Sequence, residues 1–130
     1  MSNCDVCIGG DFDGDGSEFF EITEPKARKP HKCYECGIMI NPGDRYERVA
    51  GKWEGEFATF ETCLFCVEVR KVFSCGESVS YGELWDSMIE AAFPRLTTAS
   101  PCFCNLSADS KQKLLHKWNR WKFKGQIHET

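Results

Sequence analysis

Two pairs of cysteines have a spacing that is typical of zinc ligands. Two residues separate Cys33 from Cys36, and two residues separate Cys63 from Cys66. This spacing lets both thiolates of a pair reach one ion, and two such pairs complete a tetrahedral site. Four sulfur ligands leave no position for water, so we expect this zinc to be structural. The alternative interpretation is a set of redox-active dithiols or buried free cysteines.

Five further cysteines are candidates for a second zinc site. Cys4 and Cys7 form a third pair with the same spacing, whereas Cys75, Cys102 and Cys104 stand singly. A site that combines the pair with Cys75 and with either Cys102 or Cys104 would fasten the N-terminus to later parts of the chain. Because the single cysteines lack a specific spacing, free thiols are an equally good interpretation. One zinc is therefore expected, and a second stays open.

Acidic residues are concentrated at the start of the chain. The first 24 residues hold seven carboxylates and no lysine or arginine, and since the whole chain has a formal charge of −4, the remainder has +3. An ordered surface of this kind could imitate a nucleic-acid backbone and dock into a basic groove of a partner protein. A solubilising tail is the alternative. The carboxylates proposed to bind the partner are Asp11, Asp13, Asp15 and Glu18.

Basic residues form a stripe near the C-terminus. Lys113, Lys117, Arg120 and Lys124 follow one another at intervals of four, three and four residues, which places them on one face of a helix. Such a stripe could contact the phosphates of a nucleic acid. An ordinary solvated face, or pairing with the acidic N-terminus, is the competing interpretation.

The sequence offers no recognisable catalytic set. Nucleases built on zinc modules need catalytic histidines near a metal, yet no histidine lies between Lys32 and Lys71. Neither a hydrolytic triad motif nor a phosphate-binding glycine loop is present. We therefore expect a protein that is not an enzyme.

The elements that must position the four zinc ligands can be predicted from local patterns. Gly37 permits a tight turn behind the first cysteine pair. Residues 45–49 and 57–61 alternate in aromatic and β-branched character and predict a β-hairpin. A helix is expected over 64–73, with Thr62 as its cap, and it would present the second cysteine pair at its N-terminus. The helix dipole there favours thiolates.

The C-terminal third of the chain predicts two more helices. Ser80 to Glu83 has the pattern of a capping box, and the apolar residues that follow share one face until Pro94 ends the helix. A loop over 95–106 should carry the last two cysteines. A final helix, capped by Ser107 or Asp109, should extend to about Lys122.

These expectations combine into one small α+β domain that spans residues 1–130. It would consist of an acidic N-terminal segment (1–25), a treble-clef-like or zinc-ribbon-like zinc module (26–76) of knuckle, hairpin and helix, and a helical C-terminal part (77–130). The N-terminus lacks the features of a signal peptide and no segment is apolar enough to span a membrane, so we expect a cytoplasmic protein. In a reducing compartment an odd number of cysteines favours metal binding over disulfides.

The zinc module resembles a family of small phage and prophage proteins of unknown function. The resemblance is carried by KARKPHKCYECG, INPGDRYERVAGKWEGEF and TFETCLFC, and it extends over roughly residues 1–90. It implies a zinc-binding accessory protein that acts in the cytoplasm of a bacterial host, and it implies no particular activity.

Taken together, the residues favour a non-enzymatic, structural-zinc-binding accessory protein. Segregated charge without a catalytic set predicts binding to a macromolecular host partner, a protein or a nucleoprotein complex, as an inhibitor of host or defence machinery. The alternative is a nucleic-acid-binding accessory protein that uses the basic C-terminal helix.

Overall fold

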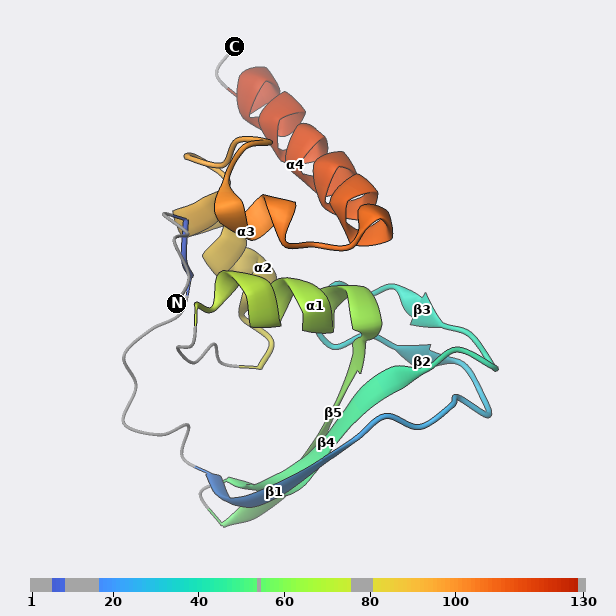
Figure 1. The fold of residues 1–130 in the computed structure, drawn as a ribbon. Coiled ribbons are helices and arrows are strands. Elements are labelled where there is room, and N and C mark those ends of the chain that lie inside the picture. Colours follow the sequence, from blue (N-terminus) through green and yellow to red (C-terminus); the bar gives the residue numbers. More distant parts are fainter. Residues whose placement is uncertain (1–5, 9–16, 54, 76–80, 129–130) are drawn as a thin grey trace.

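The computed structural model describes residues 6–8, 17–53, 55–75 and 81–128. It is a small mixed α+β structure with two antiparallel sheets and several helices (Figure 1). The elements in chain order are β1 (Ser17–Thr23), β2 (His31–Lys32), β3 (Met39–Ile40), β4 (Tyr46–Trp53), β5 (Glu56–Cys63), α1 (Leu64–Phe73), α2 (Leu84–Ser87), the π-helical segment η1 (Met88–Ala92), α3 (Pro101–Cys104) and α4 (Ala108–His128).

The larger sheet has three antiparallel strands in the order β1-β4-β5. The expected hairpin is present, but its strands are longer than predicted because Gly51 lies within β4, where it pairs with Ala58 of β5. The turn between β4 and β5 contains Gly55, at φ +83°. On the other side of β4, Ile22 of β1 is the register partner of Val49.

The smaller sheet holds the first cysteine pair. It consists of β2 and β3, in which His31 pairs with Ile40 and Lys32 pairs with Met39. Cys33 and Cys36 lie in the turn that joins the two strands. We call residues 31–40 the knuckle.

Helix α1 follows β5 without a connecting loop and lies between the larger sheet and the C-terminal helices (Figure 1). Its N-cap residue is Cys63, with ψ 152°, and no side chain caps it. The expected Thr62 cap is therefore wrong. Thr62 belongs to β5, where it is buried opposite Glu47. The strand continues to the helix, and its last residue has the extended backbone that an N-cap requires.

The hydrophobic core is formed mainly by the helices. The side chains of Phe73, Leu84, Met88 and Leu114 are fully buried and come from α1, α2, η1 and α4. Trp118 of α4 is 8% exposed and its Nε1 donates to the carbonyl of Phe93 at 3.2 Å.

The second helix differs from the prediction at both ends. Its N-cap residue is Glu83, whose own side chain makes no capping hydrogen bond, so the helix begins later than the predicted capping box implies. Ser80 lies outside the described residues. The helix then widens into η1, where the Phe93 amide donates to the Met88 carbonyl five residues earlier at 2.7 Å. Such a bulge changes the direction of the side chains. Ile89, expected in the apolar face, is 42% exposed.

The C-terminal part contains one more helical turn than predicted. The expected loop over 95–106 includes α3, and α4 continues to His128 beyond the predicted end at Lys122. Ser107 caps α4 as expected, since its Oγ accepts from the Ser110 amide at 3.3 Å. Within the described residues, no helix is long and apolar enough to cross a membrane.

Candidate metal centres

The sulfur atoms of Cys33, Cys36, Cys63 and Cys66 all lie within 4.8 Å of one another. Those of Cys36 and Cys63 are 3.8 Å apart. Zinc–sulfur bonds of about 2.3 Å in a tetrahedron place the sulfurs about 3.8 Å from each other. The geometry and the soft donor atoms therefore fit a tetrahedral metal ion such as zinc. We call this cluster the quartet.

Two short backbone structures position the ligands of the quartet. In the knuckle, the Cys33 amide donates to the Ile38 carbonyl at 2.8 Å and the Gly37 amide donates to the Cys33 carbonyl at 2.9 Å. This turn needs a left-handed residue, and Gly37 supplies it at φ +77°. Cys63 and Cys66 come from the end of β5 and the first turn of α1.

N–H groups donate hydrogen bonds to sulfurs of the quartet. The amide of Cys63 donates to Sγ of Cys33 at 3.3 Å, and Nε1 of Trp85 donates to Sγ of Cys66 at the same distance. Donors of this kind stabilise negative charge on a thiolate and orient the ligand. The sequence did not indicate Trp85, because its contact with Cys66 depends on how α2 packs against α1.

The four thiols affect one another's ionisation. The pKa of Cys33 lies below its ordinary value because Cys36, Cys63 and Cys66 donate hydrogen bonds to its sulfur. The pKa values of Cys63 and Cys66 are raised, first by their hydrogen bonds with Cys33 and Cys36 and then by burial. Without a cation the quartet therefore retains protons, which a divalent metal must displace.

Glu35, inside the first cysteine pair, anchors the knuckle. Its side chain is fully buried and forms an ion pair with Arg70 of α1. The same carboxylate accepts hydrogen bonds from the amides of Gly82 at 3.0 Å and Leu84 at 3.1 Å. Glu35 thus links the knuckle to α1 and to the start of α2. Sequence reasoning missed this role, since its only local signal is a charged residue between two ligands.

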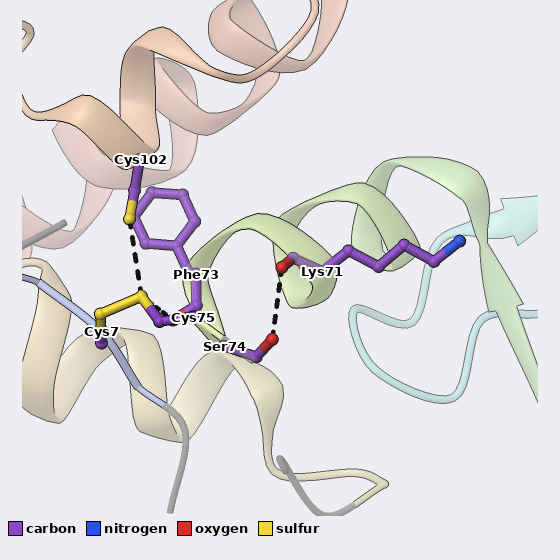
Figure 2. The surroundings of a disulfide bond; sticks show 6 residues. All are labelled: Cys7, Lys71, Phe73, Ser74, Cys75 and Cys102. Carbon is purple, nitrogen blue, oxygen red and sulfur yellow. Dashed lines mark hydrogen bonds between the residues drawn. A yellow bond between two sulfur atoms is a disulfide. The ribbon is translucent and has the colours of Figure 1, made fainter. Parts of the chain in front are cut away.

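A second sulfur cluster lies at the opposite end of α1. Cys7 and Cys75 form a disulfide, with their Cα atoms 5.8 Å apart, although the sequence favoured metal binding over disulfides. The sulfurs of Cys7, Cys75 and Cys102 lie within 4.8 Å of one another, and those of Cys75 and Cys102 are 3.9 Å apart (Figure 2). Cys4 lies outside the described residues.

Cys104 does not join the second cluster. It is exposed, and its sulfur donates to the Thr98 carbonyl at 3.5 Å. Cys102, two residues earlier in α3, is fully buried. Between the two candidates that the sequence left open, the structure therefore brings Cys102 to the cluster.

A groove of about 920 Å³ lies beside the quartet. Cys36 and Cys63 line it together with apolar residues of the knuckle, including Ile38 and Met39. Ile38 is 56% exposed and Met39 is 50% exposed. We call this the knuckle groove.

The basic stripe of α4 supplies most of the cations of the knuckle groove, which Asp44, Glu68 and Asp109 also line. Lys113, Lys117 and Arg120 line it, together with His116. Lys113 forms an ion pair with Asp109 at 3.1 Å, and Nζ of Lys117 lies 4.7 Å from the ring centre of Trp85. The side chain of Lys124 lies outside the described part of the chain.

The acidic residues expected to bind a partner are not placed by the structure. Asp11, Asp13 and Asp15 lie outside the described residues. Glu18 belongs to β1, which pairs with β4, but its side chain is not described either. The interpretation of this segment as an ordered acidic surface stays a prediction.

No family model, curated protein or solved structure matches this chain. The resemblance to phage and prophage proteins therefore stays a prediction. The function has to be argued from the quartet, the second sulfur cluster and the knuckle groove.

Proposed function

We propose that this chain is a non-enzymatic, zinc-stabilised binding protein whose knuckle groove takes an acidic segment of a partner protein. The observation that carries the proposal is the composition of the groove. Lys117 and Arg120 contribute positive charge, and Ile38 and Met39 contribute exposed apolar surface. An acidic segment with apolar side chains would satisfy both at once.

The metal site supports binding rather than catalysis. A centre with four thiolate ligands has no open position for water or substrate. The knuckle, the β4–β5 hairpin and α1 would together form a treble-clef-like module around it. Because Cys36 and Cys63 also line the knuckle groove, the metal would fix the shape of the surface that meets the partner.

The resemblance to phage proteins suggests where the partner is found. A bacterial host protein or nucleoprotein complex, such as a component of a defence system, would be bound and inhibited.

The acidic N-terminal segment (1–25) offers a separate surface for the same partner. If it contributes, replacing Asp11, Asp13, Asp15 and Glu18 by Asn or Gln removes four charges and weakens binding and its salt dependence. Unchanged binding would limit the interaction to the groove.

A nucleic acid is the second candidate ligand, and a specific observation favours it. A hollow of about 530 Å³ is lined by Lys26, Arg28, Lys29 and Arg48, so positive charge also gathers away from α4. Cations that neutralise phosphates give an affinity that falls steeply with salt. Absence of any nucleic-acid binding at about 50 mM salt, where such contacts are strongest, would remove this candidate.

Charge reversal in the knuckle groove tests the leading proposal. The zinc-loaded protein, the double variant Lys117→Glu with Arg120→Glu, and a matched control would each capture partners from a bacterial lysate, with and without nuclease. Lys111→Glu with Lys122→Glu is the control, because both lysines are on α4, neither lines the groove, and the change in charge is the same. Thermal unfolding would verify that every variant is folded.

We expect the groove variant to lose a protein partner that the wild type and the control retain. Nuclease should not change the result. Equal capture by both double variants would contradict the role of the groove. Capture that disappears with nuclease would instead support the nucleic-acid candidate.

A further inference from the structure

We propose that a basic hollow outside the knuckle groove binds a di- or triphosphate group, carried by a free nucleotide or by the 5′ end of an RNA. The hollow has a volume of about 530 Å³, and its lining includes Lys26, Arg28, Lys29, His31, Tyr46 and Arg48. We call it the cation hollow. It shares no lining residue with the knuckle groove, so the proposal does not depend on the function proposed for that groove.

The positive charge of the cation hollow is not balanced by the residues around it. Among the residues that the structure describes, no carboxylate lines this hollow, and its lysines and arginines take part in no ion pair. The knuckle groove differs, because Asp44, Glu68 and Asp109 lie among its cations and Asp109 pairs with Lys113. In a chain with a formal charge of −4, such a local concentration of free cations attracts an anion.

The backbone that carries these cations has a fixed course. The segment between β1 and β2 passes beside the start of β4, where Lys26 forms a β-bridge with Arg45 (Figure 1). The Ala27 amide donates to the Asp44 carbonyl at 2.8 Å, and the side chain of Ala27 is buried. A ligand therefore has to order only the side chains of the cations, which lowers the entropic cost of binding.

Two aromatic rings form the buried side of the cation hollow. The ring centres of His31 and Tyr46 are 4.9 Å apart, and Tyr46 is 5% exposed. Nδ1 of His31 lies 2.8 Å from the Glu61 carboxylate, which holds the imidazole in place. Glu61 is also the register partner of Arg48, but it does not line the hollow. The hollow thus combines a rigid aromatic wall with exposed cations.

Adjacent phosphates match this charge better than a nucleic-acid backbone does. The volume of the hollow is in the range of sites that take a small ligand. A phosphate monoester carries a charge of about −1.5 to −2 at neutral pH, so balancing four cations requires more than one phosphate. A nucleic-acid strand carries one charge per phosphate and distributes these charges along its length. Arginine can also bind phosphate oxygens through two N–H groups at once.

Calorimetric titration with inorganic triphosphate tests the proposal. The zinc-loaded wild type, Arg28→Gln with Lys29→Gln, and the control Arg95→Gln with Lys111→Gln would be compared without magnesium. The control also removes one arginine and one lysine, and neither residue lines the hollow. Thermal unfolding and native mass spectrometry would verify that each protein is folded and retains its zinc.

We expect one triphosphate per wild-type chain, and orthophosphate should bind much more weakly. The hollow variant should lose at least about tenfold in affinity, since contacts between charged groups are removed, while the control should not change. Absence of saturable binding, or equal loss in both double variants, would overturn the proposal. Partner capture through the knuckle groove would be unaffected by that result.

Competition experiments identify the source of the triphosphate. A nucleoside triphosphate and a short RNA with a 5′-triphosphate would each compete with inorganic triphosphate, and whichever competes more strongly carries the group. The same RNA with a 5′-hydroxyl should not compete. Equal competition by this RNA would overturn the proposal in favour of the nucleic-acid backbone.

Amide chemical shifts of the wild-type protein locate the site without any variant. Triphosphate should shift the signals of Thr23, Tyr46 and Arg48, which line the hollow. Shifts confined to α4 would contradict the assignment.

Discussion

Trp85 connects Cys66, a candidate metal ligand, to the knuckle groove. Its Nε1 donates to Sγ of Cys66, while its ring stacks on Phe65 with centres 5.7 Å apart and lies under the ammonium group of Lys117. An N–H donor to a ligand sulfur stabilises the thiolate form that binds metal. One side chain therefore contacts both the candidate zinc site and a cation of the surface proposed to bind the partner.

Replacing Trp85 by Phe should weaken metal binding without unfolding the protein. Phe retains most of the ring but cannot donate to Cys66, and losing such an outer contact typically lowers metal affinity by roughly ten- to a hundred-fold. Competition with a chromophoric chelator would measure the affinity.

Trp121→Phe is the matched control for this substitution. Trp121 is partly buried and packs against Phe93 instead of a sulfur. We expect its substitution to leave zinc affinity unchanged. Equal affinities for wild type and Trp85→Phe would show that the N–H group contributes nothing to the site.

At the scale of elements, one carboxylate joins α1 to the start of α4. Glu68 accepts hydrogen bonds from the Ser107 amide at 2.5 Å, from the Ser107 hydroxyl at 3.0 Å and from the Ser110 hydroxyl at 2.6 Å. Burial, the largest single influence, raises the pKa of Glu68, but the bonds from Ser110 and Ser107 together hold the pKa below its ordinary value. Negative charge at a helix N-terminus is also favourable.

Substituting Glu68 with Gln should reduce the free energy of unfolding by about 1 kcal/mol at neutral pH, since hydrogen bonds to a charged acceptor are replaced by weaker ones. A group whose pKa is lowered by folding contributes stability above its unfolded pKa, and this contribution disappears as the pH falls through its folded pKa. The difference between wild type and variant, measured by denaturant unfolding, should therefore shrink in acid. Glu90→Gln, at an exposed position of η1, is the control. A difference that is absent at neutral pH would contradict the role of Glu68.

Local patterns predicted some elements well and others poorly, for identifiable reasons. Helix 64–73 was predicted with its observed bounds because apolar periodicity and helix-ending residues agree there. The π-helical segment η1 was not predicted, because a single extra residue in a helical turn leaves no periodic signal in the sequence. The four residues of α3 are too few for periodicity to be recognised.

At the scale of the whole molecule, α1 is the element that the two sulfur clusters share. Cys63 and Cys66 lie at its N-terminal end, and Cys75 follows its C-terminal end in a left-handed conformation at φ 55°. Each cluster attaches a different part of the chain to this helix, the knuckle at one end and α3 at the other. In a chain of 130 residues, a metal ion bound at such a cluster would add to the stability of a limited core.

Sequence spacing identified the members of the quartet because both ligands of a pair are local. The supporting residues could not be found in the same way. Glu35 meets Arg70, and Trp85 meets Cys66, only after α1 and α2 have packed. Cys7 and Cys75 are 68 residues apart, so their proximity likewise depends on tertiary structure.

Metal bound in the quartet is expected to maintain the structure of residues 33–73. Circular dichroism of the reduced protein, recorded before and after a strong chelator has removed all bound zinc, tests it most directly. Zinc that binds only the folded state contributes its binding energy to folding, so we predict that its removal abolishes most of the signal from β4, β5 and α1. A spectrum that does not change after verified loss of zinc would contradict the account.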